Sequence, residues 1–118
     1  MKCSYEGIGQ WAATFACEDL AEGEVVKISA NGTVGACSAG DDFCGMALSV
    51  GRDGGACSVA LGGMVTAGYT VPSQGAAPAL GWAALTADGA GGVQADAGGR
   101  SFLVVDVDES AETVTFVL

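Results

Sequence analysis

Short apolar runs, most of them closed by a turn that contains glycine, follow one another from residue 20 to the end of the chain. The 20 glycines lie between these runs and lack the Gly-X-Y period of collagen. No segment keeps apolar residues at positions i, i+3, i+4 and i+7 over three turns, as a helix with one buried face would. Short strands that recur roughly every 8–12 residues are typical of β-sandwiches and β-barrels. The chain is therefore predicted to be all-β.

Two stretches show the hairpin pattern most clearly. Asn31 and Gly32 separate two alternating runs, and both residue types tolerate the positive φ that a tight hairpin turn requires. In the first of these runs, the alternation predicts that Val26 and Ile28 face the core. Residues 102–118 form a second predicted hairpin, because two runs rich in β-branched residues flank a short polar loop there.

Residues 1–16 follow neither a strand nor a helix period. We predict that they form an extended N-terminal arm, with or without a short strand at its end, and that residues 17–118 form a single β domain. Three of the eight aromatic residues lie in this arm: Tyr5, Trp11 and Phe15. Such an arm packs either on its own domain or on a neighbouring protein. These three side chains are therefore the candidate partner-binding residues.

Acidic residues outnumber basic ones by 14 to four, which gives a formal net charge of −10. Phosphate binding needs several clustered Lys or Arg residues, whereas the four here are scattered along the sequence. Neither nucleic acid nor an anionic membrane is therefore the expected partner. No stretch reaches the roughly 20 apolar residues of a membrane helix, and no signal peptide is visible. The acidic balance favours solubility and suits docking onto a basic or mixed protein surface.

The chain lacks the residue pattern of an enzyme. It contains no histidine, so the usual general base near neutral pH is missing. The five cysteines are Cys3, Cys17, Cys37, Cys44 and Cys57. Their odd number and the absence of a CxxC pair favour reduced, buried thiols over zinc ligands. Acidic groups such as Asp41-Asp42 lie in predicted turns, where aspartate caps the backbone. We predict a non-catalytic protein with no cofactor and no metal site.

Several motifs built from glycine and β-branched residues follow one another in a set order. They are the runs 23–28, 31–34, 43–47 and 57–65 and the closing strands 102–108 and 114–118. Together they resemble the small decoration proteins of tailed-phage heads. In that family a G-x-V-V strand and a turn are followed by an x-G-x-A strand and a V-x-V-x-G-x-V segment. The resemblance covers residues 20–118.

The resemblance implies a β-tulip-like barrel or sandwich that binds the outside of an assembled head and reinforces it, commonly as a homo-trimer. The major capsid protein would be its partner. The chain would be made in the host cytoplasm and would end on the capsid exterior of the virion. In such proteins the N-terminal arm often adds a strand to a sheet edge of the capsid. Tyr5, Trp11 and Phe15 would then be the anchors.

Two other interpretations stay open. The chain could be a β-barrel module that binds a carbohydrate or another small molecule, with Trp82 as a stacking platform; otherwise Trp82 is a core residue. A cysteine-based enzyme or redox protein is the third interpretation, and it ranks last because no histidine is present to activate a thiol.

Overall fold

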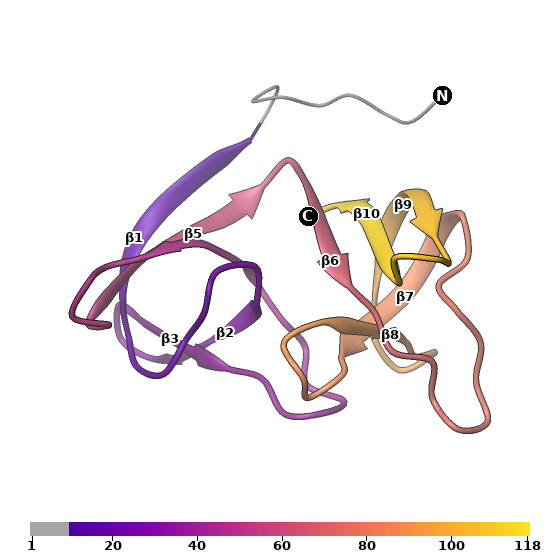
Figure 1. Cartoon of the computed structure of the whole chain (residues 1–118), viewed down its shortest axis with the longest axis horizontal. Helices are drawn as coiled ribbons and strands as arrows, with labels where there is room; N and C mark the ends of the chain where they lie inside the picture. The colour runs from indigo at the N-terminus through magenta and orange to yellow at the C-terminus, as the bar shows by residue number, and fades with distance from the viewer. Residues whose placement is uncertain (1–9) are drawn as a thin grey trace.

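A computed structural model describes residues 10–118, and these residues form ten β-strands and no helix. The strands are β1 (Trp11–Cys17), β2 (Val25–Ala30), β3 (Thr33–Ala36), β4 (Gly45–Val50), β5 (Ala56–Gly62), β6 (Met64–Gly68), β7 (Gly81–Ala87), β8 (Val93–Ala95), β9 (Arg100–Asp108) and β10 (Thr113–Val117). The first five strands close into a barrel, and the last five form a second sheet beside it (Figure 1). The all-β prediction is therefore confirmed.

The barrel has the strand order β1-β3-β2-β4-β5, and β5 pairs back onto β1. Residues 11–16 of β1 pair antiparallel with β5, and the end of β1 pairs parallel with the start of β3. The hairpin of β2 and β3 turns at Asn31-Gly32, and Gly32 has the positive φ of 63° that this turn requires. Closure leaves the barrel without an open sheet edge, so each of its five strands is needed.

The start of the described chain differs from the predicted arm. Residues 11–16, the second half of that arm, belong to β1, so the boundary predicted after residue 16 falls inside a barrel strand. In β1 the inward positions, Ala13, Phe15 and Cys17, alternate with exposed ones. This alternation is hard to recognise in the sequence because small alanines occupy both faces of the strand. The first half of the predicted arm, which includes Tyr5, lies outside the described residues.

The second sheet has the order β6-β10-β9-β7-β8, and all of its neighbouring strands are antiparallel. The predicted C-terminal hairpin is β9 and β10, which pair from Asp108↔Thr113 to Leu103↔Val117. The two ends of the sheet approach each other through an isolated parallel bridge between Tyr69 and Val93. This sheet is therefore almost closed.

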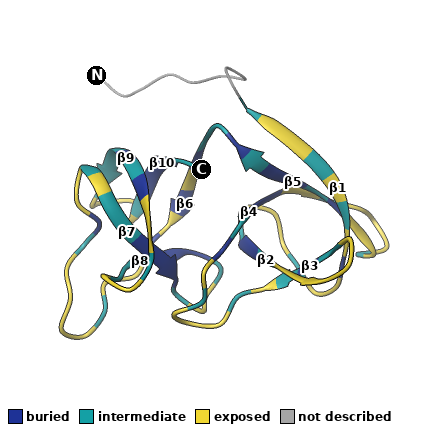
Figure 2. Cartoon of the chain, turned by 180° about the vertical axis from the view of Figure 1, so that it is seen from behind, coloured by how far each residue is buried: buried dark blue, intermediate teal, exposed yellow. Residues whose placement is uncertain are grey.

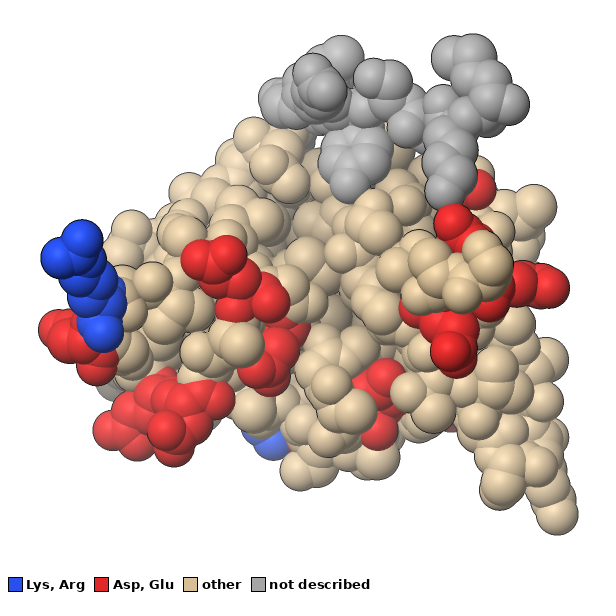
Figure 3. All heavy atoms as spheres, viewed as in Figure 1, with Lys and Arg blue, Asp and Glu red and all other residues tan. Residues whose placement is uncertain are grey.

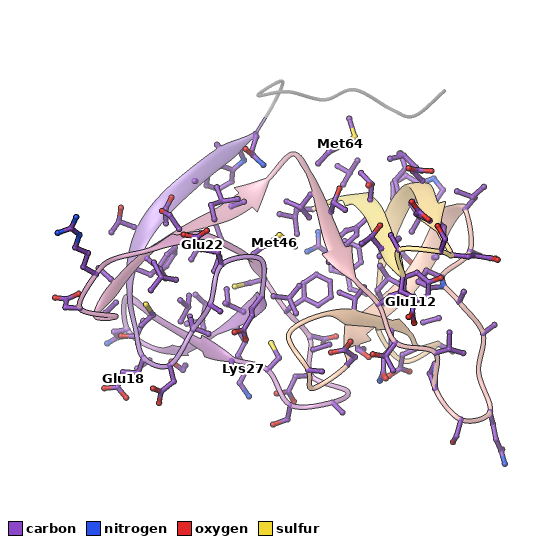
Figure 4. The ribbon with its side chains drawn as sticks, in the orientation of Figure 1. Glu18, Glu22, Lys27, Met46, Met64 and Glu112 are labelled. Carbon is purple, nitrogen blue, oxygen red and sulfur yellow. The ribbon has the colours of Figure 1, made fainter. Side chains whose placement is uncertain are left out.

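Neighbouring residues in the barrel strands are buried on opposite sides of the barrel wall. Val26 of β2 and Val59 of β5 belong to a cluster inside the barrel, whereas Val25 and Ala60, beside them in sequence, belong to the cluster shared with the second sheet. Met46 of β4 joins the shared cluster and lies between the two halves (Figure 4). Buried positions therefore occur in both halves of the molecule (Figure 2). Strands covered on both faces read as continuous apolar runs instead of alternating ones.

The prediction that Ile28 faces the core is wrong, whereas the same prediction for Val26 is confirmed. Ile28 is 54% exposed and Val26 is fully buried. The strand β4 pairs with β2 only at Val25 and Val26. The outer part of β2 therefore extends past its neighbour, and its side chains have no second layer to cover them.

Three phenylalanines connect the two halves. Phe43, which precedes β4, stacks on Phe102 of β9 with ring centroids 5.0 Å apart and an interplanar angle of 7°. Phe116 of β10 meets both rings edge-on, at 5.8 Å from Phe43 and 5.3 Å from Phe102. Such geometries are the preferred ones for aromatic pairs. The barrel and the second sheet therefore share one aromatic core and form a single domain.

Candidate functional site

Trp11 is 60% exposed although it belongs to a barrel strand. The register between β1 and β5 shifts between Trp11 and Ala12. Further along β1, Phe15 and Cys17 pack on the barrel interior. The indole of Trp11 rests on Gly62, where an added Cβ atom would collide with the ring. Glycine at position 62 therefore lets a large aromatic side chain approach the strand closely while most of it stays open to solvent.

The other two predicted anchors are placed differently. Phe15 is half-buried and packs against the cluster inside the barrel, so its main contacts are with its own domain. Tyr5 lies outside the described residues. Trp11 is therefore the described anchor candidate that presents an aromatic surface to a partner.

Trp82 is not a core residue, which was one of the two roles predicted for it. In β7 the core-facing positions are Ala83, Leu85 and Ala87. Trp82 points to the opposite face of the sheet and is 76% exposed, and Leu80 just before β7 is 68% exposed. No motif marked this face in the sequence, although the alternation of β7 could have indicated it.

Trp82 lines none of three well-defined depressions on the described surface. One of about 980 Å³ lies at an end of the barrel, against β1, β3 and the turn 53–55. One of about 380 Å³ surrounds Tyr69 between the barrel and the second sheet. One of about 460 Å³ is lined by residues 72–75 and 94–97. Because Trp82 is 76% exposed on a sheet face, a ligand that stacked on it would bind on an open surface.

The acidic residues of the turns are engaged by backbone groups and by one lysine. The Nζ atom of Lys27 donates to Asp41 Oδ2 at 2.6 Å, and the backbone N–H of Ser38 donates to the same oxygen. These bonds, the lysine bond foremost, hold the pKa of the Asp41 carboxyl below its ordinary value. Backbone N–H groups donate to four further aspartates: Asp53, Asp88, Asp96 and Asp108. Between residues 10 and 118, no group of three or more potential ligands could hold a metal ion.

The four described cysteines carry free thiols. Cys17 and Cys57 are buried in the barrel, and Cys37 and Cys44 are half-buried. Burial raises the pKa of Cys57 to about 11, with Cys17 beside it as a smaller cause, and it also raises the pKa of Cys37 to about 11. The pKa of Cys44 is raised by burial too. A raised pKa makes a thiol a poor nucleophile, because the thiolate is the reactive form.

Thiol labelling of the native protein should therefore be slow near neutral pH. At pH 7 a pKa of about 11 leaves a thiolate fraction of about 10⁻⁴ at Cys37 and Cys57. Labelling of these two should accelerate roughly tenfold per pH unit until the pH approaches their pKa, and all sites should react at once after unfolding in urea. The test uses the Cys3→Ser variant, which removes the thiol outside the described residues. A fast-labelling cysteine in this variant at pH 7 would restore the redox interpretation.

No helix within residues 10–118 is long and apolar enough to cross a membrane. The chain matches no protein-family model and no curated protein. Its function therefore has to be inferred from its own residues and surfaces.

Proposed function

We propose that the chain is a non-catalytic capsid decoration protein that binds the outer surface of a tailed-phage head as a homo-trimer. Its partner is the major capsid protein, and it is located on the capsid exterior of the virion. The exposure of three large apolar side chains, Trp11, Leu80 and Trp82, on a well-packed domain carries the proposal. Exposed aromatic residues of this size are the usual anchors of protein interfaces.

Trp11 is well suited to act as such an anchor. Its indole already lies on the backbone at Gly62 in the unbound chain, so little side-chain freedom remains to be lost on binding. The strand that carries it is paired along its length with β5. A partner would therefore meet a preformed aromatic surface on a rigid barrel wall.

The net charge of −10 also supports a role on a larger assembly. Copies of the free chain repel one another, which limits non-specific association before the correct surface is met. On the shell, basic groups of the partner would offset this repulsion. A homo-trimer would then be stable chiefly where the shell neutralises part of its charge.

A binding experiment with phage heads tests this function. Empty heads assembled from the major head protein of the phage that encodes the chain should bind the wild-type chain saturably in co-sedimentation. Trp11→Ala should weaken binding by roughly tenfold, or about 1.4 kcal/mol. Chemical cross-linking of the chain while it is bound to the heads should give a species with the mass of three chains.

Ile28→Ala is the matched control, because Ile28 is an apolar residue of similar exposure on another strand of the barrel. Its head binding should equal that of the wild type. Heads that fail to retain the wild-type chain would refute the decoration function. Equal losses in both variants would show that Trp11 is not a specific anchor.

The carbohydrate-binding alternative has one observation in its favour, the open indole of Trp82. Sugar platforms combine an aromatic face with polar groups that fix the orientation of the ligand in a concave site. Trp82 lines none of the depressions described above. Its cross-strand neighbour, Leu103, is apolar. The surroundings of Trp82 therefore favour a protein partner.

A further inference from the structure

A row of apolar side chains crosses the outer face of the second sheet. Trp82 of β7 lies opposite Leu103 of β9, Leu103 lies opposite Val117 of β10, and Val117 lies opposite Met64 of β6. Residues directly opposite each other in antiparallel strands have Cβ atoms about 5 Å apart. The row therefore spans four neighbouring strands, a width of roughly 14 Å.

The row points away from the core. Its sequence neighbours Phe102, Val104 and Phe116 face inward and are fully or almost fully buried. Leu103 and Val117 alternate with them on the opposite face and are only half-buried. A surface strand normally carries polar residues at such positions. The apolar residues of the row belong to neither buried cluster, so packing of the core does not account for them.

Acidic groups flank the row on one side. At the next strand pair on the same face, Asp106 lies opposite Thr115, whose hydroxyl shares a 2.7 Å hydrogen bond with the hydroxyl of Thr66. The turn beyond it carries the exposed Glu109. In Figure 3 the acidic groups over the second sheet form a cluster on the right, and the basic groups visible in that view lie on the barrel side.

The described basic residues do not neutralise this flank. Lys27 and Arg52 lie on the barrel, in β2 and in the turn before β5. The guanidinium of Arg100 lies over the ring of Phe102, which faces the core, at 5.1 Å from the ring centroid. The outer face of the second sheet therefore combines an apolar row with a one-sided negative border.

We infer that this face, centred on Trp82, Leu103 and Val117, is a docking surface for a partner protein that presents an apolar segment with Lys or Arg residues on one side. Charge complementarity selects this occupant. A second copy of the chain would bring another net charge of −10 to the same face, which opposes self-association. The inference rests on the proposed function only in requiring that the chain binds another protein, and it names a surface on the second sheet, whereas Trp11 lies on the barrel.

An NMR titration of the full chain with a short synthetic peptide of alternating Leu and Lys residues tests the surface directly. Shift changes should concentrate at the indole N–H of Trp82 and at the backbone of Leu103 and Val117. Affinity should fall roughly tenfold in Trp82→Ala and in Leu103→Thr. It should also fall when salt is raised from about 0.05 M to about 0.5 M, because salt screens the acidic border.

Two control peptides separate the apolar and the electrostatic parts. A Ser/Lys peptide keeps the charge and lacks the apolar residues, and a Leu/Glu peptide keeps the apolar residues and reverses the charge. Neither should shift the Trp82 signal at concentrations where the Leu/Lys peptide saturates. Equal binding of the Leu/Lys peptide to the wild type and to a folded Trp82→Ala variant would overturn the inference.

The other possible occupants give distinct results, each of which would overturn the inference. If a second copy occupies the face, the free chain will self-associate in sedimentation and Trp82→Ala will be monomeric. If residues 1–9 occupy it, their deletion will raise the affinity for the peptide roughly tenfold. The peptide titration does not involve phage heads. Heads that do not bind the chain would therefore refute the decoration function but not the docking surface.

Discussion

Deletion of residues 1–16 should leave the chain unfolded, whereas deletion of residues 1–9 should leave its β-structure intact. The larger deletion removes all of β1 except Cys17. The barrel would then lose the strand that joins β3 to β5. Two sheet edges would open, and buried side chains such as Val34 and Val59 would meet water.

Circular dichroism and urea unfolding measure this difference. The chain without residues 1–9 should keep the wild-type strand signal and a single cooperative transition. The chain without residues 1–16 should show no cooperative transition. The division of the sequence into an arm at 1–16 and a domain at 17–118 predicts instead that both truncated chains fold. A cooperative transition in the shorter chain would thus show that β1 is dispensable.

Phe116→Ala should be strongly destabilising, by about 3–5 kcal/mol. Phe116 is fully buried and contacts both Phe43 and Phe102, so its removal leaves a cavity where the barrel meets the second sheet. Domains of this size are typically stable by only about 5–15 kcal/mol. The free energy of unfolding, measured in urea by circular dichroism, should therefore fall by a large part of its total.

Trp82→Ala is the matched control for this measurement. It also removes an aromatic ring from the second sheet, but from the exposed face, so its cost should stay below about 1 kcal/mol. If both variants lost the same free energy of unfolding, the contacts that Phe116 makes between the two halves would not be an important source of stability. Two separate unfolding transitions in Phe116→Ala would show that the halves unfold independently once the shared aromatic core is disrupted.

Much of the fold can be predicted from local patterns. The Asn31-Gly32 turn and the hairpin of β9 and β10 both occur where the sequence indicates them. Turn residues act on the two or three backbone angles next to them, so their effect does not depend on the rest of the chain. The same holds for aspartates that accept hydrogen bonds from backbone N–H groups, as Asp108 does in the last turn.

The candidate site was harder to predict, and Trp11 and Trp82 show why. Both are large aromatic residues in strands, and such residues are usually buried when a sheet has one covered face. Trp11 is exposed because of a register shift against β5, and Trp82 because the core lies on the other side of β7. Neither cause is visible within a few residues of the tryptophan.

The sequence by itself determined that the chain is all-β, where most of its strands and turns lie, and that its charge is strongly acidic. These properties follow from backbone preferences and side-chain composition, which act locally. Only the tertiary structure decided that residues 11–16 close the barrel, that Ile28 is exposed, and that an apolar row crosses the outer face of the second sheet. Each of these depends on which distant strands pair and which faces meet, and pairing between residues as far apart in sequence as Trp11 and Gly62 leaves no local signal.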